Sequence, residues 1–452
     1  MGTTIDISSK LLKSPGNKNL GNRIKLKWLK HAFLFFLITA ALLSHHWWGY
    51  LDPLAILTRI STVLIYPLGA MFTEKTLMSL LKFSPTSPLI DPVYTLFKTN
   101  IVPEKAPLTV GVFGVMLLAG FIWGTEKISR RFWCRHICPA GALLGLLSQF
   151  RFYERYVSES CTVCNRCQVE CKMNAIPEGD VKETDKTECI ECFNCGSECP
   201  PKVSAISYKW NWKPYRSEVD LSRRKFITAT VGGVAAVGLL QINLPLKKEK
   251  AAIIRPPGAI PESDFLDKCI RCLECVRICQ SNGACLQPAG ISDSLENIWT
   301  PVANMREGYC EYGCNLCGQV CPTDAILPLP LQVKKKLPMG VAYFDKNLCI
   351  PYARHEDCLV CEEHCPIPDK AIKFHIQNTE LPDGSIRKVK YPYVERELCI
   401  GCGICENKCP LPTQPGVFVI SEKEQRWENT PTLEQIQEKL SPSASGGDYY
   451  GD

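Results

Sequence analysis

The stretch that decides the fold of this chain reads CTVCNRCQVEC at residues 161–171 and returns as CIECFNCGSECP at residues 189–200. Each half places three cysteines with two residues between neighbours, and a fourth cysteine follows after three intervening residues. Three thiolates at this spacing lie on one tight loop, where they can bind three corners of an iron–sulfur cubane, and the fourth can reach a second cubane. The spacing therefore predicts two [4Fe-4S] clusters in residues 151–207.

This run is typical of bacterial two-cluster ferredoxins, in which each fourth cysteine serves the other cluster. The rule assigns the first cluster to Cys161, Cys164, Cys167 and Cys199. It assigns the second cluster to Cys189, Cys192, Cys195 and Cys171. Structural zinc is the competing interpretation, because four-cysteine zinc sites also use paired two-residue spacings. Even spacing within both sets favours iron–sulfur clusters.

Four more cysteine sets lie in residues 263–420, which we predict to be a four-cluster domain. The sets are Cys269, Cys272, Cys275, Cys279; Cys310, Cys314, Cys317, Cys321; Cys349, Cys358, Cys361, Cys365; and Cys399, Cys402, Cys405, Cys409. The second and third sets have three and eight residues in their first gaps, which enlarge the loop without removing a ligand. Both blocks together supply 24 ligands for six [4Fe-4S] clusters, and the pairing among the last four sets stays open.

Three cysteines fall outside these sets. Cys285 stands where ferredoxin repeats carry an apolar residue, so we interpret it as part of the core. Cys134 and Cys138 form a Cys-x3-Cys-Pro motif, and two thiols cannot hold a cubane alone. This pair is either structural, redox-active or completed by ligands of a partner.

The composition agrees with metal ligation. The chain has 452 residues and 27 cysteines, whereas disulfide frameworks belong to small secreted chains. The net charge is +6, and the basic residues gather beside apolar runs, which is typical of membrane boundaries and not of a nucleic-acid surface. The sequence has no dinucleotide fingerprint, P-loop or Cys-x-x-Cys-His haem motif, so we expect no nicotinamide, flavin or covalent haem.

Residues 23–150 are predicted to be a membrane domain that follows a polar tail at residues 1–22. Uncharged runs at residues 32–51 and 106–124 are close to the length that crosses a bilayer. Basic clusters adjoin both runs and should face the cytoplasm. The cluster before the first run consists of Arg23, Lys25, Lys27 and Lys30.

Two other apolar stretches of this region are not expected to span. Residues 60–73 are short and contain Pro67 and Gly69, so we expect an interfacial or re-entrant segment. Residues 139–150 are rich in leucine and should form a helix along the membrane surface. The expected fold class is multidomain: an α-helical transmembrane region with α+β bacterial ferredoxin-like domains.

A linker at residues 208–262 contains SRRKFI at 222–227, which opens an uncharged run ending at residue 246. A twin arginine at such a place is an export address for proteins that fold before crossing; a plain transmembrane helix is the alternative. Export would place residues 263–420 in the periplasm and residues 151–207 in the cytoplasm of a bacterium, with the chain in the inner membrane. Residues 421–452 are expected to be a tail with a disordered end.

Two resemblances to known families now become specific. The stretch RFWCRHICP at residues 131–139, the LDPL turn at residues 51–54 and the first cysteine block resemble the NapH-type family of polytopic membrane ferredoxins. That family is implicated in quinol oxidation and usually carries two Cys-x3-Cys-Pro motifs, whereas this chain has one in its membrane half.

The second half is similar to the NapG-type periplasmic ferredoxin of the same quinol dehydrogenase. The shared features are the twin-arginine segment, RPPGA at residues 255–259, MGVA at 339–342, CPIPDKAI at 365–372 and the eight-residue gap before Cys358. The spacing of the second set departs from that family. The chain therefore resembles a fusion of the two subunits.

These resemblances imply an oxidoreductase subunit that takes electrons from menaquinol or ubiquinol in the quinone pool. The electrons would pass to a periplasmic c-type cytochrome or terminal reductase. Candidate quinone contacts are His45, His46, Asp52 and Arg59, because ionisable side chains near a bilayer are often functional. The alternative is that this cluster anchors the chain at the interface, together with neighbouring aromatic residues.

Three other functions remain possible from the sequence. The chain could donate electrons to mature or assemble a partner metalloenzyme. It could be a ferredoxin subunit that faces the cytoplasm throughout. It could also be a zinc scaffold without redox chemistry.

Overall fold

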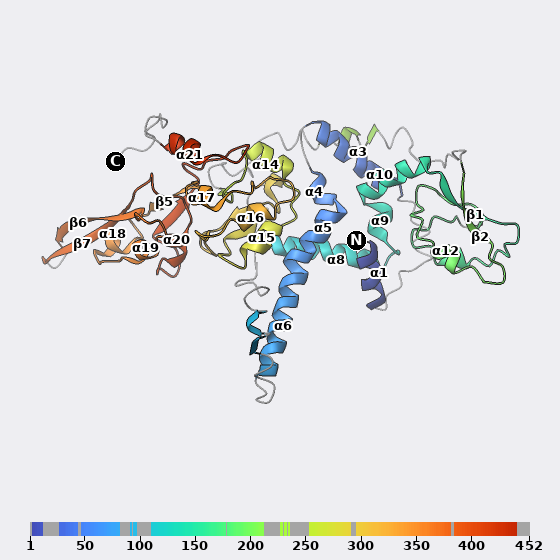
Figure 1. Ribbon diagram of the computed structural model, residues 1–452, viewed down its shortest axis with the longest axis horizontal. Helices are drawn as coiled ribbons and strands as arrows, with labels where there is room; N and C mark the ends of the chain where they lie inside the picture. The colour runs from blue at the N-terminus through green and yellow to red at the C-terminus, as the bar shows by residue number, and fades with distance from the viewer. Residues whose placement is uncertain are drawn as a thin grey trace. The chain divides into compact units, whose positions relative to one another are not determined.

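The computed structural model divides the chain into two compact units, which are described separately (Figure 1). One unit comprises residues 1–57 and 116–242, and the other comprises residues 58–115 and 243–452. The region predicted as one membrane domain is thus shared between them. The structure describes residues 2–11, 27–43, 47–81, 91–92, 94–96, 110–177, 179–211, 227–228, 230–232, 234–235, 253–290, 295–380 and 384–440.

The first unit combines helices with the first cysteine block. Its elements are α1 (Gly2–Leu11), α3 (Trp28–Leu42), α4 (Trp48–Leu51), α9 (Phe132–His136), α10 (Pro139–Leu147), η2 (Ser148–Phe150), β1 (Tyr153–Val157), α11 (Arg166–Val169), α12 (Asn194–Ser197) and β2 (Ile206–Trp210). Strands β1 and β2 pair antiparallel and bracket the cysteine block between them. The leucine-rich stretch after residue 139 is helical, as predicted.

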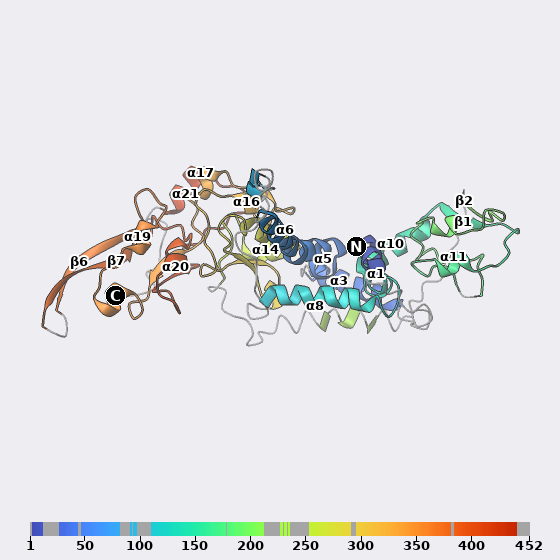
Figure 2. The ribbon, with the colours of Figure 1, turned by 90° about the horizontal axis from the view of Figure 1, so that it is seen from below.

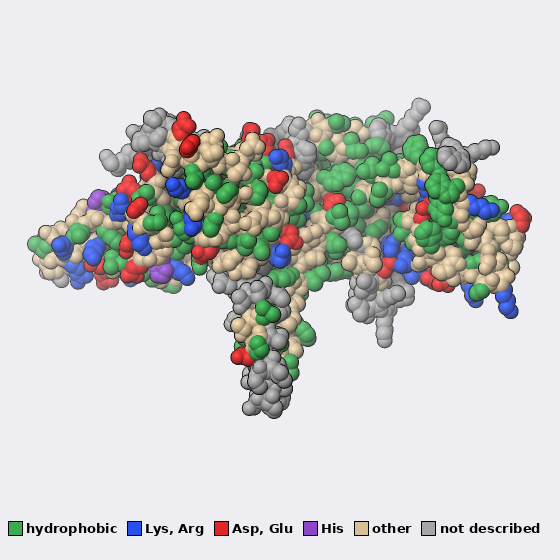
Figure 3. All heavy atoms as spheres, viewed as in Figure 1, with side chains coloured by type: hydrophobic (Ala, Val, Ile, Leu, Met, Phe, Trp, Pro, Cys, Tyr) green, Lys and Arg blue, Asp and Glu red, His purple; other side chains and the backbone are tan. Residues whose placement is uncertain are grey.

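Helices α3 and α10 pack together, and hydrophobic side chains gather over them in Figure 3. The exposed fractions of these side chains are large: 81% for Leu42, 65% for Leu144 and 58% for Leu147. These side chains form an exposed apolar patch on α3 and α10, of the kind that marks an interaction surface.

Ion pairs join the helices of this unit to its cysteine block. Lys30 Nζ lies 2.8 Å from Glu188 Oε1, and both side chains are 2% exposed.

The polar tail predicted at residues 1–22 is wrong for residues 2–11, which form α1. Ile5 of α1 is buried, and Asp6 pairs at 2.7 Å with both Arg131 and Lys172. Buried contacts of this kind order a segment that composition alone marks as loose.

The span predicted at residues 32–51 is wrong as a single helix, since α3 ends at Leu42 and α4 begins at Trp48. A new helix starts at Pro53, where the Asp52 carboxylate accepts the backbone N–H of Ala55 at 2.8 Å. Aspartate as N-cap and proline at the first helical position are strong start signals that hydropathy does not see. The second expected span corresponds to the 16-residue helix α8 (Val110–Thr125).

The segment at residues 60–73, which we expected to be short, is part of a longer helix. Helix α5 (Pro53–Ile60), the π-helical turn η1 (Ser61–Ile65) and α6 (Tyr66–Leu81) form one helix of 29 residues. Among the described residues it is the one helix long and apolar enough to cross a membrane. The π-helical turn immediately precedes Pro67, where a regular turn would clash with the proline ring.

The second unit contains the four remaining cysteine sets. Beside η1 and α6, its elements are α14 (Glu262–Lys268), α15 (Glu274–Cys279), β3 (Leu286–Pro288), η5 (Leu295–Asn297), β4 (Pro301–Ala303), α16 (Leu316–Gln319), α17 (Leu331–Lys334), β5 (Val341–Phe344), α18 (Ile350–Arg354), α19 (Val360–Glu363), β6 (Ile372–Glu380), β7 (Ile386–Val394), α20 (Ile404–Lys408), β8 (Val417–Ile420) and α21 (Leu433–Leu440). Strands β3–β4, β5–β8 and β6–β7 form antiparallel pairs.

One hydrophobic core holds the first two of these sets together. It includes Phe265, Val276 and Ile326, and also Ile436 of α21. The tail predicted at residues 421–452 is therefore packed as far as α21, and residues 441–452 lie outside the described part. The β6–β7 hairpin extends away from the remaining strands as a twisted ribbon (Figures 1 and 2).

The hairpin braces the long insertion before Cys358. The Tyr352 hydroxyl donates to the Pro392 carbonyl at 2.8 Å, and the Asp357 carboxylate accepts the Lys390 backbone N–H at 2.8 Å. The eight-residue gap thus replaces a tight loop with one supported by strand β7.

A close backbone approach joins the first two sets. A Cβ atom at Gly283 would lie 2.0 Å from the Tyr309 carbonyl oxygen, and Tyr309 N–H donates to the Gly283 carbonyl at 2.8 Å. We expect Gly283→Ala to destabilise this unit by about 3 kcal/mol, because backbone must move to admit the methyl group. Urea unfolding followed by cluster absorbance measures the loss. Gly313→Ala, with nothing within 4 Å of the added atom and no positive φ, is the control and should change stability little; an equal loss in both variants would contradict the prediction.

Candidate cluster sites

Four of the six cysteine sets share one loop geometry. In each set, the residues immediately before and after the second cysteine have a left-handed backbone conformation with positive φ. These pairs are Val163 and Asn165, Glu191 and Phe193, Arg271 and Leu273, and Gly401 and Gly403. The second member of each pair is the N-cap of the helix that carries the third cysteine. With two residues between cysteines, the backbone therefore forms a tight loop that leads directly into a helix.

The first two sets of the second unit exchange their fourth cysteines. The pKa of Cys272 is raised to about 11, first by burial and then by the neighbouring thiols of Cys269 and Cys321. The pKa of Cys317 is raised by burial and by the thiols of Cys310, Cys279 and Cys314. We call these groups site A (Cys269, Cys272, Cys275, Cys321) and site B (Cys310, Cys314, Cys317, Cys279).

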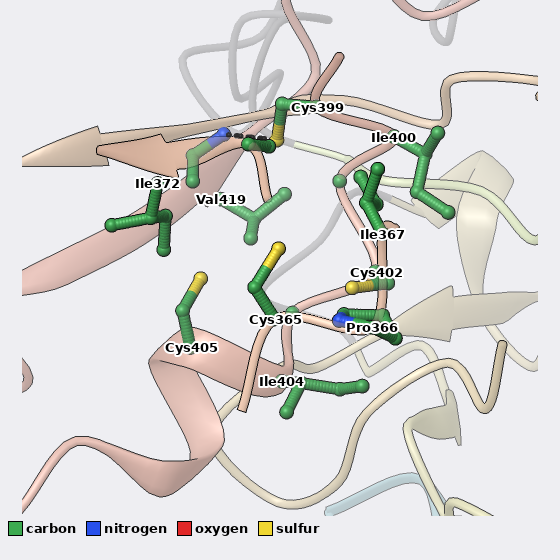
Figure 4. Close-up of a pocket in the computed structure, with 14 residues that line it drawn as sticks. Cys365, Pro366, Ile367, Ile372, Cys399, Ile400, Cys402, Ile404, Cys405 and Val419 are labelled. Atoms are coloured by element: carbon green, nitrogen blue, oxygen red, sulfur yellow. Dashed lines mark hydrogen bonds between the residues drawn. The ribbon is translucent and has the colours of Figure 1, made fainter. Parts of the chain in front are cut away.

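The last two sets exchange their fourth cysteines in the same way. The pKa of Cys349 is raised to about 12 by burial and then by Cys358 and Cys409, which with Cys361 define site C. Site D consists of Cys399, Cys402, Cys405 and Cys365, which line one cavity of about 350 Å³ (Figure 4). Its other walls are apolar, and the Ala342 N–H donates to Cys399 Sγ at 3.4 Å. The pairing that the sequence left open is therefore crossed in both halves.

In the first unit, Cys189, Cys192, Cys195 and Cys171 line one cavity. This is the crossed set that the ferredoxin rule predicts for the second cluster. The Tyr208 hydroxyl lies 3.1 Å from Cys195 Sγ, and Arg155 donates to Cys167 Sγ at 3.5 Å. Cys164 and Cys192 are exposed, so both clusters of this block would approach the surface.

The cysteine quartets fit iron–sulfur clusters. No group of three or more His, Cys, Asp or Glu side chains within the described part of the chain converges on a point that suits a single metal ion. Four cysteines line the cavity of site D and four line a cavity in the first unit, which is the ligand set that a four-iron cubane takes. A bound cluster supplies the positive charge that keeps buried thiols deprotonated, and it exchanges one electron at a time.

Cys285 is buried, as predicted, but it also lies against site B. Its Sγ is 3.8 Å from Cys279 Sγ. The pKa of Cys310 falls to about 6, first because Cys285 donates a hydrogen bond to it. Only the burial of Cys285 could be predicted from the sequence, since its contact with site B forms only when the two sets cross.

The four candidate quinone contacts do not form one group in the described residues. His45 and His46 lie outside them, as does the twin-arginine stretch SRRKFI up to residue 226. Asp52 caps the start of α5, whereas Arg59, near the end of the same helix, is fully buried against the Arg271 carbonyl. Cys134 and Cys138 are free thiols, and burial raises the pKa of Cys134 to about 11, which disfavours its thiolate.

Comparisons with known proteins agree with the cysteine geometry. Family profiles described as "4Fe-4S binding domain" match residues 109–153 and 392–411. The chain is 34% identical over 189 residues to the methylamine utilization ferredoxin-type protein MauM of Methylorubrum extorquens, covering 40% of this chain and 81% of the relative. No solved structure matches.

Two further relatives give the same result. MauM of Paracoccus denitrificans is 37% identical over 178 residues, covering 39% of this chain and 73% of the relative. The ferredoxin-type protein NapG of Escherichia coli is 32% identical over 187 residues, covering 40% and 78%. With its crossed cysteine sites, the chain belongs to the family of MauM and NapG ferredoxin-type proteins, and it is an iron–sulfur electron-transfer protein.

Proposed function

We propose that the chain is a membrane-bound protein with six [4Fe-4S] clusters that oxidises menaquinol or ubiquinol and passes the electrons to a periplasmic c-type cytochrome or terminal reductase. The observation that carries this proposal is an apolar helix joined directly to the cluster-bearing unit. Helix α6 and the turn before it belong to the second unit, although their sequence lies far from the cysteines.

Both ends of the segment between residues 66 and 111 return to the same core. Val63 before it and Val112 after it are buried in the cluster that holds Phe265 and Cys275. Between them, α6 exposes apolar side chains, including Leu68 at 62% and Phe72 at 74%. We define residues 66–111 as the anchor. The 16 residues of α6 rise about 24 Å, which is most of the bilayer core of about 30 Å.

The electron balance of this proposal is simple. A quinol releases two protons and two electrons when it becomes a quinone, and each cluster accepts one electron. Two clusters, or one cluster twice, must therefore be reduced for each quinol. A chain of several clusters accommodates this because the first electron can move on before the second arrives.

The location of the two blocks follows from the export interpretation. Residues 263–420 would be periplasmic, and residues 151–207 cytoplasmic. External protease on intact spheroplasts should cleave the four-cluster unit and spare the first block. Protection of residues 263–420 would overturn the periplasmic placement and favour a chain that faces the cytoplasm.

Quinol-linked reduction tests the activity. Purified full-length protein in detergent should bleach its cluster absorbance on addition of a short-chain menaquinol or ubiquinol analogue. Phe72→Arg should weaken quinol-linked reduction in reconstituted vesicles, since an arginine near the bilayer centre costs about 3 kcal/mol. Dithionite should still reduce this variant fully. Dithionite-reducible clusters that never respond to quinol, in wild-type protein, would defeat quinol oxidation and support a maturation donor.

A further inference from the structure

The loops of the cluster sites are held by cations that the cysteine count does not reveal. Lys334 is 2% exposed, and its Nζ donates to the Glu311 and Tyr312 carbonyls, between the first two cysteines of site B. At site A the same place is taken by Arg59. Its Nε donates at 2.9 Å to the Arg271 carbonyl, between Cys269 and Cys272.

Arg59 differs from Lys334 because it comes from a distant part of the chain. It lies 212 residues before Arg271 and is 0% exposed. Its guanidinium sits 4.2 Å from the ring centre of Trp299. One turn later, the Thr62 hydroxyl lies 3.4 Å from the Cys272 carbonyl oxygen and 3.1 Å from that of Arg59, so it can donate to either. The helix that leads into the anchor therefore contacts both peptide groups that flank the middle of the site A loop.

We propose that Arg59 is a positioning residue that raises the reduction potential of the cluster at site A, the site that the helix leading into the anchor contacts, so that electrons arriving from the anchor enter at this cluster. Reduction adds one electron to the cluster and breaks no bond, so the cluster gains one negative charge. A buried cation stabilises that charge more strongly than a solvated one, because the surrounding dielectric is low. Charge and hydrogen bonds near the cysteines are established determinants of cluster potential.

The inference deepens the proposed function, since it names the cluster that receives electrons beside the anchor. It also makes the reduction potential of site A depend on the packing of α5. The Arg59 cation lies beside the site A loop only while α5 is packed against that loop. Lys334 lies only 23 residues after Glu311, next to the loop that it holds, so it makes no such link to a distant helix.

Potentiometric titration of full-length protein, monitored by EPR, tests the proposal. Signals are assigned to sites A and B with Cys272→Ser and Cys314→Ser. Arg59→Gln retains a donor for the Arg271 carbonyl and removes the charge. It should lower the reduction equilibrium constant of site A about tenfold, or about 59 mV for one electron, and leave site B unchanged. Arg59→Lys should restore most of the wild-type value.

Lys334→Gln is the matched control, because it should shift site B and leave site A. A site A potential that is unchanged in Arg59→Gln overturns the proposal, as does an equal shift at both sites. Loss of the site A cluster in Arg59→Gln, with Arg59→Lys at wild-type potential, would show that the residue only holds the loop and would also overturn it.

Two further measurements keep this test apart from quinol oxidation. The titration uses dithionite and mediators, so a failure of quinol oxidation leaves its outcome intact. Hydrogen exchange of residues 58–65 should remain slow in Arg59→Lys and become faster in Arg59→Gln. Suppose that hydrogen exchange stays at wild-type rates in both variants while the site A potential falls in Arg59→Gln. The charge of Arg59 would then set the potential, and the dependence on the packing of α5 would be overturned.

Discussion

Cys321→Ala is expected to disable the cluster of site A and to leave the cluster of its own sequence set intact. The thiol of Cys321 lies with Cys269, Cys272 and Cys275, and it raises the pKa of each of the last two. Removal of one ligand should convert the cubane to a three-iron form or release it. Iron analysis should show a loss of about one to four irons per chain, and EPR should show loss of the site A signal.

The corresponding removal of the crossed ligand of site B, Cys279, needs two substitutions. Cys285 Sγ lies 3.8 Å from Cys279 Sγ, close enough to replace it as a ligand after a small movement. We therefore expect Cys279→Ala to be mild and Cys279→Ala with Cys285→Ala to abolish the site B signal. If Cys321→Ala instead removes the site B signal, the ligands are not crossed and the assignment of both sites fails.

Lys30→Met is expected to destabilise the first unit by about 3–5 kcal/mol. The substitution leaves the Glu188 carboxylate buried without its partner, and an uncompensated buried charge carries a penalty of this size. Glu188 adjoins the ligand Cys189, so the cluster nearby should be released at lower urea concentration. Cluster absorbance and tryptophan fluorescence during urea titration measure both effects.

Lys27 provides the matched control for this prediction. Its Nζ lies 3.5 Å from Asp185, and the two side chains are 41% and 31% exposed. Lys27→Met should cost less than about 1 kcal/mol, because exposed ion pairs contribute little. Lys30→Met with Glu188→Leu should recover most of the stability. A double variant as unstable as Lys30→Met would contradict an origin in the unpaired charge.

The sequence predicted the cysteine ligands, because their chemistry depends on local spacing. It also predicted the crossed set of Cys189, Cys192, Cys195 and Cys171, whose repeat follows a known rule. The pairing of the four later sets was not predictable, since stretched loops such as the one before Cys358 obscure the repeat. That pairing is set by contacts between loops, such as the approach of Gly283 to Tyr309.

Helix boundaries and distant contacts were predicted less well. Hydropathy averaged over residues 32–51 did not reveal that α3 ends at Leu42 and α4 begins at Trp48, nor that Asp52 caps a further helix. Arg59 and Lys30 were grouped by charge with membrane functions, yet both are buried against cysteine loops. A partner 212 residues away, as for Arg59, leaves no pattern in a single sequence.

The left-handed loop pairs also bear on the metal-free state of the protein. Each left-handed residue other than glycine costs about 1–2 kcal/mol, so loops built from Val163 or Leu273 are strained before iron arrives. The loop with Gly401 and Gly403 carries little strain and is ready in the metal-free chain. The metal-free loop of site D should therefore reach its cluster-binding conformation at a lower free-energy cost than the loops at Val163 or Leu273.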